Sequence, residues 1–322
     1  MTPRLPFAPH KPWLAPLAGF SDLPFRLLCR ELGAEAAVTE MISAKGLVYD
    51  SRNTQPILAT CAEDAPLAAQ LFGSEPEFMA RAMDLLMARG FAWFDLNCGC
   101  SVPKVVKTGS GAALMKEPGT LLDVARAMVG RAGPGRVGVK MRLGWDPKSE
   151  NYLDVARDLE QAGVGWLTLH PRHARQGFTG AADWPRIALL RRTVSIPVLA
   201  SGDLWTAEDA ARCLAETGAS GVMFARGALR DPAVFLRLKA LLGAGDAPPP
   251  SLAWTIRRHV ELIHRHGTPA REMLKMRTIV PRYVRRVDGS KELRNRLVHC
   301  SSWEELEGIV REVEQLEAIK AS

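Results

Sequence analysis

The sequence has few of the features that mark metal sites, disulfide frameworks or membrane spans. Its 322 residues include six cysteines, none in a CxxC pair, and seven histidines, none clustered at zinc-binding spacing. No apolar run approaches the roughly 18 residues of a membrane-spanning helix. The N-terminal segment has no apolar core of a secretion signal. These absences predict a cytoplasmic protein with free thiols, no bound metal and no membrane contact, and we expect a monomer.

The net charge of the whole chain says little about its binding partner, whereas the strongly basic segment near the C-terminus says more. Lysine and arginine number 42 against 35 acidic residues, a net charge of +7, and many basic proteins bind nothing anionic. Residues 252–300, however, carry 12 basic against 4 acidic side chains. Arg271, Lys275, Arg282, Arg285 and Arg286 recur there near helical spacing. We expect a stripe that neutralises RNA phosphates; a merely solvated helix face is the alternative.

Short apolar runs alternate with helix-length amphipathic stretches up to about residue 241. Parallel strands need crossover helices between them, and eight repeats without a reversal favour a closed barrel over an open doubly wound sheet. The predicted fold class is therefore α/β, a (β/α)₈ TIM barrel. The predicted strands are Trp13–Ala18, Ala36–Met41, Leu67–Phe72, Trp93–Cys98, Val137–Leu143, Trp166–Pro171, Pro197–Gly202 and Gly221–Arg226.

A change of pattern divides the chain into two predicted domains. Residues 243–251 read Gly-Ala-Gly-Asp-Ala-Pro-Pro-Pro-Ser, which cannot continue a helix and is typical of a linker. Helical patterns alone follow it. We therefore expect a catalytic barrel over residues 1–243 and a small helical bundle over residues 252–322.

Polar residues gather where the predicted strands end, and the active site of such a barrel lies at the carboxyl ends of its strands. One such residue is usually structural, but six strands that share the pattern are hard to explain by packing. The six polar strand ends carry Gln70; Asn97; Lys140 and Arg142; His170 and Arg172; Ser201, Gly202 and Asp203; and Ala225 and Arg226, and the first strand ends in Pro16, Leu17 and Ala18.

The turns after the last two strands favour a phosphorylated cofactor. Gly202 and Gly227 allow backbone N–H groups to approach an anion closely, and Arg226 adds charge. Tight turns without a ligand are the alternative. Lys140 near the same cavity allows two functions: a Schiff-base lysine, or a positive charge that stabilises a reduced flavin. A rim ion pair is the third possibility.

Cys100 is the clearest candidate for a catalytic side chain. It follows a predicted strand end, next to Gly99 and close to Lys104 and Lys107, so its thiol is predicted to be accessible and able to exchange a proton. Cys98 belongs to the strand itself, and we expect it to be buried and inert.

Several of these segments resemble the dihydrouridine synthase family of bacterial type. The resemblance covers most of the chain, in the family's order and at similar spacing. The most specific segment is Asn97-Cys98-Gly99-Cys100, which is similar to the family's Asn-x-Gly-Cys active-site motif. The other matching segments begin at Ala15 (Ala-Pro-Leu-Ala-Gly-Phe-Ser-Asp), Lys140 (Lys-Met-Arg-Leu-Gly-Trp), His170 (His-Pro-Arg), Gly177 (Gly-Phe-Thr-Gly), Ser201 (Ser-Gly-Asp) and Ala225 (Ala-Arg-Gly).

The resemblance implies an FMN enzyme that reduces specific uridines of tRNA to 5,6-dihydrouridine and uses NADPH to restore the flavin. It further implies that hydride passes from the flavin to C6 of uracil and that Cys100 supplies the proton to C5. Asn97, Lys104, Arg142, Arg172, Arg282, Arg285 and Arg286 are the expected substrate contacts. The residues expected to hold FMN are Pro16, Leu17, Ala18, Gln70, Lys140, His170, Ser201, Gly202, Asp203, Ala225 and Arg226.

Three positions depart from the family pattern, and three other functions remain as alternatives. Ser101 follows Cys100 where the family has proline, Ser201 replaces an asparagine, and Ala225 replaces a glycine. The alternatives are a dihydroorotate-dehydrogenase-like FMN barrel acting on a small molecule, a flavin-free Schiff-base aldolase that uses Lys140, and a non-catalytic RNA-binding protein.

Overall fold

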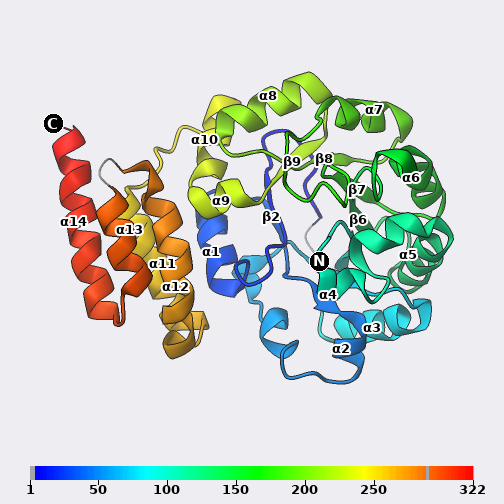
Figure 1. Ribbon diagram of the computed structural model, residues 1–322, viewed down its shortest axis with the longest axis horizontal. Coiled ribbons are helices and arrows are strands. Elements are labelled where there is room, and N and C mark those ends of the chain that lie inside the picture. Colours follow the sequence, from blue (N-terminus) through cyan, green and yellow to red (C-terminus); the bar gives the residue numbers. More distant parts are fainter. Residues whose placement is uncertain (1–3, 288–289, 322) are drawn as a thin grey trace.

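Eight parallel strands close into a barrel in the computed structural model, which describes residues 4–287 and 290–321 except the side chains of 269–271, 286, 320 and 321 (Figure 1). The ring closes because β1 pairs with both β2 and β9, and β2 also pairs with β4. The barrel strands are β1 (Trp13–Leu14), β2 (Ala36–Val38), β4 (Leu67–Phe72), β5 (Trp93–Cys98), β6 (Val137–Met141), β7 (Trp166–Leu169), β8 (Val198–Ala200) and β9 (Gly221–Phe224). The predicted TIM barrel is confirmed.

An extra two-residue strand, β3 (Ile42–Ser43), was absent from the eight predicted runs. It pairs with the end of β4, opposite Leu71 and Phe72. The sequence between β2 and β3 contains Glu40, whose carboxylate accepts a hydrogen bond from Gly19 N after β1. The chain therefore bends at Glu40 and returns to the sheet, so the predicted strand Ala36–Met41 is interrupted.

The barrel interior is filled from its amino-terminal end by aromatic side chains. Trp13 and Trp166 are almost wholly buried and stack with ring centroids 6.0 Å apart, and Phe7 packs on both. Gly138 makes room for them, because a Cβ at that position would lie 2.0 Å from the Trp166 indole. This end of the barrel is a packed core, and space remains only at the carboxyl ends of the strands.

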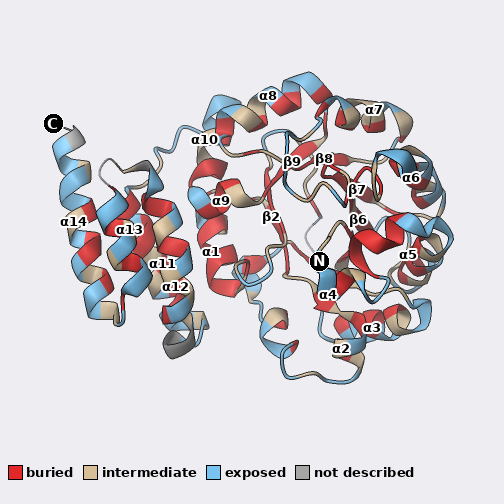
Figure 2. Ribbon diagram, in the orientation of Figure 1, coloured by how far each residue is buried: buried red, intermediate tan, exposed pale blue. Residues whose placement is uncertain are grey.

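Amphipathic helices cover the outside of the barrel with their buried faces inward (Figure 2). Local signals set several of their ends: the Asp22 carboxylate caps α1, Thr206 and Asp209 form a capping box on α8, and Gly218 ends α8 with φ +63°. The main helices are α1 (Leu23–Glu31), α3 (Pro76–Ala88), α5 (Pro118–Ala132), α6 (Tyr152–Gln161), α7 (Pro185–Thr193), α8 (Ala207–Thr217) and α10 (Val234–Leu241). The shorter ones are α2 (Ala44–Val48), α4 (Pro103–Val106) and α9 (Arg226–Arg230).

Four further helices, α11 (Leu252–His266), α12 (Pro269–Tyr283), α13 (Ser290–His299) and α14 (Trp303–Ala321), pack together beside α1 (Figure 1). Two ion pairs join them to the barrel: Lys275 Nζ lies 2.6 Å from Asp22, and Arg258 lies 2.7 Å from Glu31. Asp22 directly follows the loop after β1, so helix α12 is tied to the rim on which a barrel carries its active site.

Candidate active site

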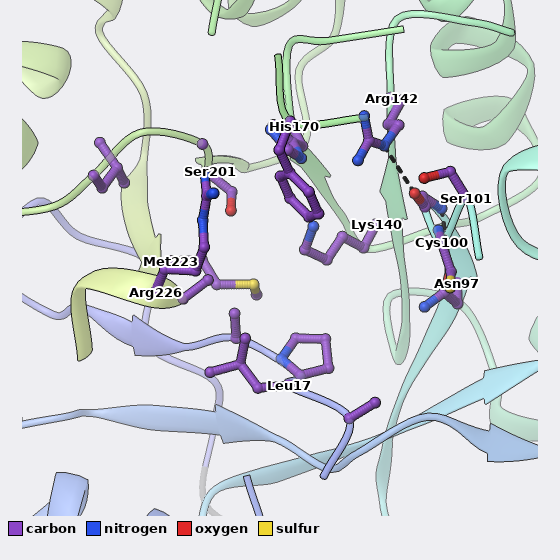
Figure 3. A pocket seen from close by; sticks show the side chains of 18 of the residues that line it. Leu17, Asn97, Cys100, Ser101, Lys140, Arg142, His170, Ser201, Met223 and Arg226 are labelled. Atoms are coloured by element: carbon purple, nitrogen blue, oxygen red, sulfur yellow. Dashed lines mark hydrogen bonds between the residues drawn. The ribbon is translucent and has the colours of Figure 1, made fainter. Parts of the chain in front are cut away.

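A cavity of about 260 Å³ opens at the carboxyl ends of the strands. Figure 3 shows Lys140 projecting into it from β6, with Leu17 and Met223 on one side and the segment around Cys100 on the other. The structure brings most of the predicted residues together there. Those that line the cavity are Pro16, Leu17, Ala18, Asn97, Cys100, Lys140, Arg142, His170, Ser201, Gly202, Asp203, Ala225 and Arg226.

The turn after β5 holds Cys100 against the cavity from both sides. Asn97 Oδ1 accepts hydrogen bonds from the backbone N–H groups of Gly99 (3.1 Å) and Cys100 (2.9 Å). Arg142 Nε donates to the Gly99 carbonyl at 2.8 Å, the dashed contact in Figure 3. Behind the turn, a Cβ on Gly111 (φ +63°) would lie 2.7 Å from the Cys100 carbonyl oxygen, so only glycine allows this approach. The half-buried thiol is thus held by rigid backbone.

Asn97 and Gln70 are placed differently from the expected contacts with substrate and cofactor. Asn97 is only 5% exposed, and besides holding the Cys100 turn it donates from Nδ2 to Gln70 Oε1 at 2.8 Å. Gln70 is fully buried and does not line the cavity. Gln70 lies under the cavity floor, whereas Asn97 lines the cavity while its amide supports the turn that carries Cys100.

Positive charge dominates one wall, and the buried carboxyl group of Asp95 favours the charged form of Lys140. Lys140 and Arg142 come from β6 and the residue after it, and Lys140 forms no hydrogen bond or ion pair within the described residues. Burial, and then the charge of Arg142, lower the pKa of Lys140 to about 8. Burial and the nearby cations hold the pKa of His170 far below its usual value, so its imidazole is neutral. Such a wall favours a ligand that is anionic or rich in acceptors.

The turn after β8 forms the opposite part of the wall. Gly202 has φ +103°, and a Cβ there would lie 2.6 Å from the His170 ring. Asp203 also has a positive φ of +52° and pairs with Arg172 at 2.5 Å and with Arg226 at 3.3 Å. Gly202 was predicted to let backbone N–H groups approach an anion closely. Its positive φ and the nearby His170 ring require glycine at this position.

Arg172 was expected to contact substrate, but the structure places it behind the wall. It is 1% exposed, and it bonds to Asp203 and to the Gly180 carbonyl (2.6 Å). It also lies 3.1 Å from His170 Nε2. Because its donors are occupied by protein groups, Arg172 positions His170 and the β8 turn.

Arg226 is held at the mouth between two aromatic rings that sequence reasoning missed. Its guanidinium lies 4.5 Å from the Phe178 ring centroid and 4.4 Å from that of Trp205. Phe178 is 60% exposed and also faces Arg142. The position of Phe178 inside the Gly-Phe-Thr-Gly segment was the only signal for it in the sequence.

Two of the three departures from the family pattern have a clear structural setting. Ala225 has φ −118°, so a side chain is accommodated there without left-handed strain. Ser101 lines the cavity beside Val102, and the proline is delayed to Pro103, which begins helix α4. Ser201 lines the cavity after β8.

The basic residues predicted on the surface lie outside the cavity. Lys104 is exposed on α4. Arg282 is exposed on α12 and stacks over Phe20, 5.1 Å from its ring centroid, and Arg285 is exposed just beyond. Neither arginine forms an ion pair within the described part of the chain. The Arg286 side chain lies outside the described residues.

A search of the described residues finds no group of three or more histidine, cysteine or carboxylate side chains placed to hold a metal. In the same residues, none of the helices combines the length and apolar character needed to cross a membrane.

The closed barrel with a cationic cavity at its mouth defines the class of TIM-barrel enzymes that bind an anionic ligand at the carboxyl ends of their strands. The chain matches the family model "Dihydrouridine synthase (Dus)" over residues 13–321 and belongs to that family of enzymes.

Curated relatives agree with this assignment over nearly the whole chain. A "Probable tRNA-dihydrouridine synthase" of Treponema pallidum is 35% identical over 312 residues, which covers 93% of this chain and 92% of its own. A "tRNA-dihydrouridine synthase B" of Xanthomonas axonopodis pv. citri is 36% identical, over 80% of this chain and 78% of its own.

Solved structures share the barrel fold at low sequence identity. A morphinone reductase mutant in complex with tetrahydroNAD superposes with a TM-score of 0.53 at 13% identity, over 74% of this chain and 88% of its own. An old yellow enzyme homologue from Zymomonas mobilis gives 0.51, also at 13% identity, over 74% of this chain and 90% of its own.

Proposed function

We propose that this protein reduces uridines of tRNA to 5,6-dihydrouridine, with FMN as its bound cofactor, NADPH as reductant and Cys100 as proton donor. The observation that carries the proposal is the cavity itself. An accessible thiol and an unpaired lysine from neighbouring strands face the same space, in a chain whose relatives are named for this reaction.

The cavity suits FMN in charge and in the kinds of group it offers. Lys140 is a cation without a hydrogen bond or close ion pair among the described residues, although the charge of Asp95 acts on it, and its ammonium group can contact an electron-rich ligand. Gly202, Arg226 and the start of α9 offer backbone N–H groups and charge to a phosphate. The remaining contacts with FMN would come from Pro16, Leu17, Ala18, Ser201, Asp203 and Ala225. Gln70 would support the FMN site from under the cavity floor.

FMN, when bound, supplies the hydride for C6 of the uracil ring. The chain's own residues then have two tasks: to hold the ring in place and to deliver a proton to C5. Cys100 is the one cysteine that lines the cavity, and its backbone is fixed on both sides. A thiol held at this position is already oriented to donate its proton. Phe178 is exposed at the mouth, where it can stack on an extruded base. Arg142, which faces its ring, is buried and donates three hydrogen bonds to backbone carbonyls, so it supports this part of the wall.

The C-terminal helices provide the surface for the rest of the RNA. Arg282 lies on Phe20, three residues after Leu17, which lines the cavity. The basic surface therefore begins next to the mouth, as required of an enzyme that docks a tRNA arm while one base enters the barrel. On this proposal residues 1–243 form the catalytic domain and residues 252–322 the tRNA-binding domain.

The direct test is mass spectrometry of tRNA from a host that lacks dihydrouridine, after incubation with the purified protein and NADPH. We expect particular uridines to gain the mass of two hydrogen atoms. A yellow protein that leaves every tRNA unchanged, yet reduces a free pyrimidine, would instead identify a small-molecule reductase.

The charge of Lys140 predicts how cofactor affinity depends on pH. Its pKa of about 8 is that of the site without a ligand, and an electron-rich ligand favours the charged form and raises this pKa. The charged form is fully present below pH 8 and is lost above it. FMN affinity of the apoprotein is therefore expected to fall by about tenfold between pH 7 and pH 9.

Fluorescence titration of FMN into wild type and Lys140→Met checks this. The variant should bind more weakly at pH 7 and show little dependence on pH. The same pH dependence in both proteins would mean that another group is responsible.

A further inference from the structure

Asp95 is a buried carboxyl group that the proposed reaction does not use. It lies on β5, two residues before Asn97, and is fully inaccessible to solvent. Burial raises its pKa to about 7, opposed by a hydrogen bond from Gln70 and by the charge of Lys140. A carboxylate is costly to keep inside a barrel unless it is paired, so its position under the cavity points to a role there.

A chain of hydrogen bonds runs from Asp95 to the turn that carries Cys100. Gln70 Nε2 donates to Asp95 Oδ2 at 2.6 Å, and Asn97 Nδ2 donates to Gln70 Oε1 at 2.8 Å. Asn97 Oδ1 in turn accepts from the N–H groups of Gly99 and Cys100. The second oxygen of Asp95, Oδ1, has no hydrogen-bond partner in the described residues. Each hydrogen bond between Asp95 and the Cys100 turn is therefore made by two groups of the protein.

The two ends of this chain determine its direction. A carboxylate only accepts hydrogen bonds, and a backbone N–H only donates. The amide groups of Gln70 and Asn97 have nearly the same shape in either orientation, so their own shape does not choose one. Above about pH 7, where Asp95 is mostly ionised, one orientation of both amides satisfies every bond between the carboxylate and the two N–H groups.

We propose that Asp95 is a positioning residue that fixes the orientation of Gln70 and, through it, the orientation in which Asn97 holds the Cys100 turn. For catalysis, this rests on the proposed function of Cys100. The structural part concerns only the chain of hydrogen bonds and is measured without tRNA.

The first test is Asp95→Asn, which keeps the shape of the side chain but offers Gln70 either an oxygen or an NH₂ group. The two N–H groups of the turn are then the one remaining end that sets the direction, so both orientations of Gln70 become possible and Asn97 is held less firmly as the acceptor of the turn. In the flavin-loaded protein we expect the Gly99 and Cys100 amides to exchange hydrogen about tenfold faster. We also expect kcat to fall with KM for tRNA unchanged.

Thr39→Val is the matched control. The Thr39 hydroxyl is as buried as Asp95 and accepts a hydrogen bond from the Gln70 backbone N–H at 3.0 Å, yet it is outside the chain of amides. Its removal should leave exchange at Gly99 and Cys100 unchanged. Equal acceleration in both variants would indicate general loosening of the sheet and overturn the proposal, as would unchanged exchange in a folded Asp95→Asn protein.

A rescue experiment gives an independent test, also if the single variant folds poorly. Adding Asn97→Asp to Asp95→Asn puts an acceptor-only group beside the two N–H groups. Gln70 can then donate toward position 97 and accept from position 95, which reverses the chain with all bonds satisfied. We expect protection of the Gly99 and Cys100 amides to return to the wild-type level. Protection that stays low in the double variant would refute a directional chain, whether or not the wild type reduces tRNA.

Discussion

Cys100→Ala is expected to lower kcat for tRNA reduction by between about 10² and 10⁴, the usual contribution of a positioned general acid. KM for tRNA and the amount of bound flavin should change little. The thiol is one group on the cavity wall, and the turn that carries it is held by backbone contacts of Gly99 and Cys100 rather than by the sulfur. Single-turnover kinetics with reduced enzyme and tRNA would isolate the proton-transfer step.

Cys98→Ala is the control for loss of a cysteine from the same strand. Cys98 is fully buried in the core between barrel and helices, and burial raises the pKa of its thiol well above the usual value. Its replacement should cost stability by about 1 kcal/mol through a small cavity and leave turnover intact. Similar losses of activity in both variants would mean that Cys100 acts through packing and not as the acid.

The barrel could be predicted from the sequence because its strands carry a strong local signal. Leu67–Phe72 and Trp93–Cys98 have the same bounds in the prediction and in the structure, since each is a short, largely apolar run that borders the clear helical pattern between them. The rule that strands of a barrel present their carboxyl ends to one cavity then placed Lys140 and Cys100 together. β3 was missed because two residues are too short for any periodicity.

Sequence reasoning could not separate polar residues that face a ligand from those that face one another. Asn97, Gln70 and Arg172 stand at strand ends like Lys140, but their partners are other side chains or backbone groups. The partner of Arg172 is Asp203, on a different turn and 31 positions later. Only the closed barrel reveals that pairing. Phe178 was missed for a related reason, because a loop has no periodicity from which orientation can be inferred.

Reversing the charge of Arg282 and Arg285 to glutamate is expected to raise KM for tRNA by about tenfold to hundredfold at moderate salt, and to leave flavin content unchanged. Both side chains are exposed and free of ion pairs among the described residues. By contrast, Arg257 and Arg258 on α11 and Arg296 on α13, in the same bundle, pair with glutamates. The unpaired arginines are therefore the ones available to phosphates.

Salt dependence distinguishes phosphate contact from a change in fold. If each arginine neutralises one phosphate, the slope of log affinity against log salt should become shallower by about two for the double variant. The matched control is Arg136→Glu with Arg192→Glu, which makes the same change in net charge at two exposed side chains that form no ion pair among the described residues. Helix α7, which carries Arg192, lies on the side of the barrel away from the C-terminal helices (Figure 1).

The control pair should change KM only slightly, because it alters the field of the whole protein but no contact. Equal effects of the two pairs would assign RNA binding to net charge alone. Unchanged binding of the Arg282 and Arg285 variant at low salt would remove this surface from the proposal. We expect the Arg282 and Arg285 variant to have the larger effect because Arg282 lies on Phe20. Phosphates bound there lie beside the loop after β1, and that loop leads directly to the cavity wall at Leu17.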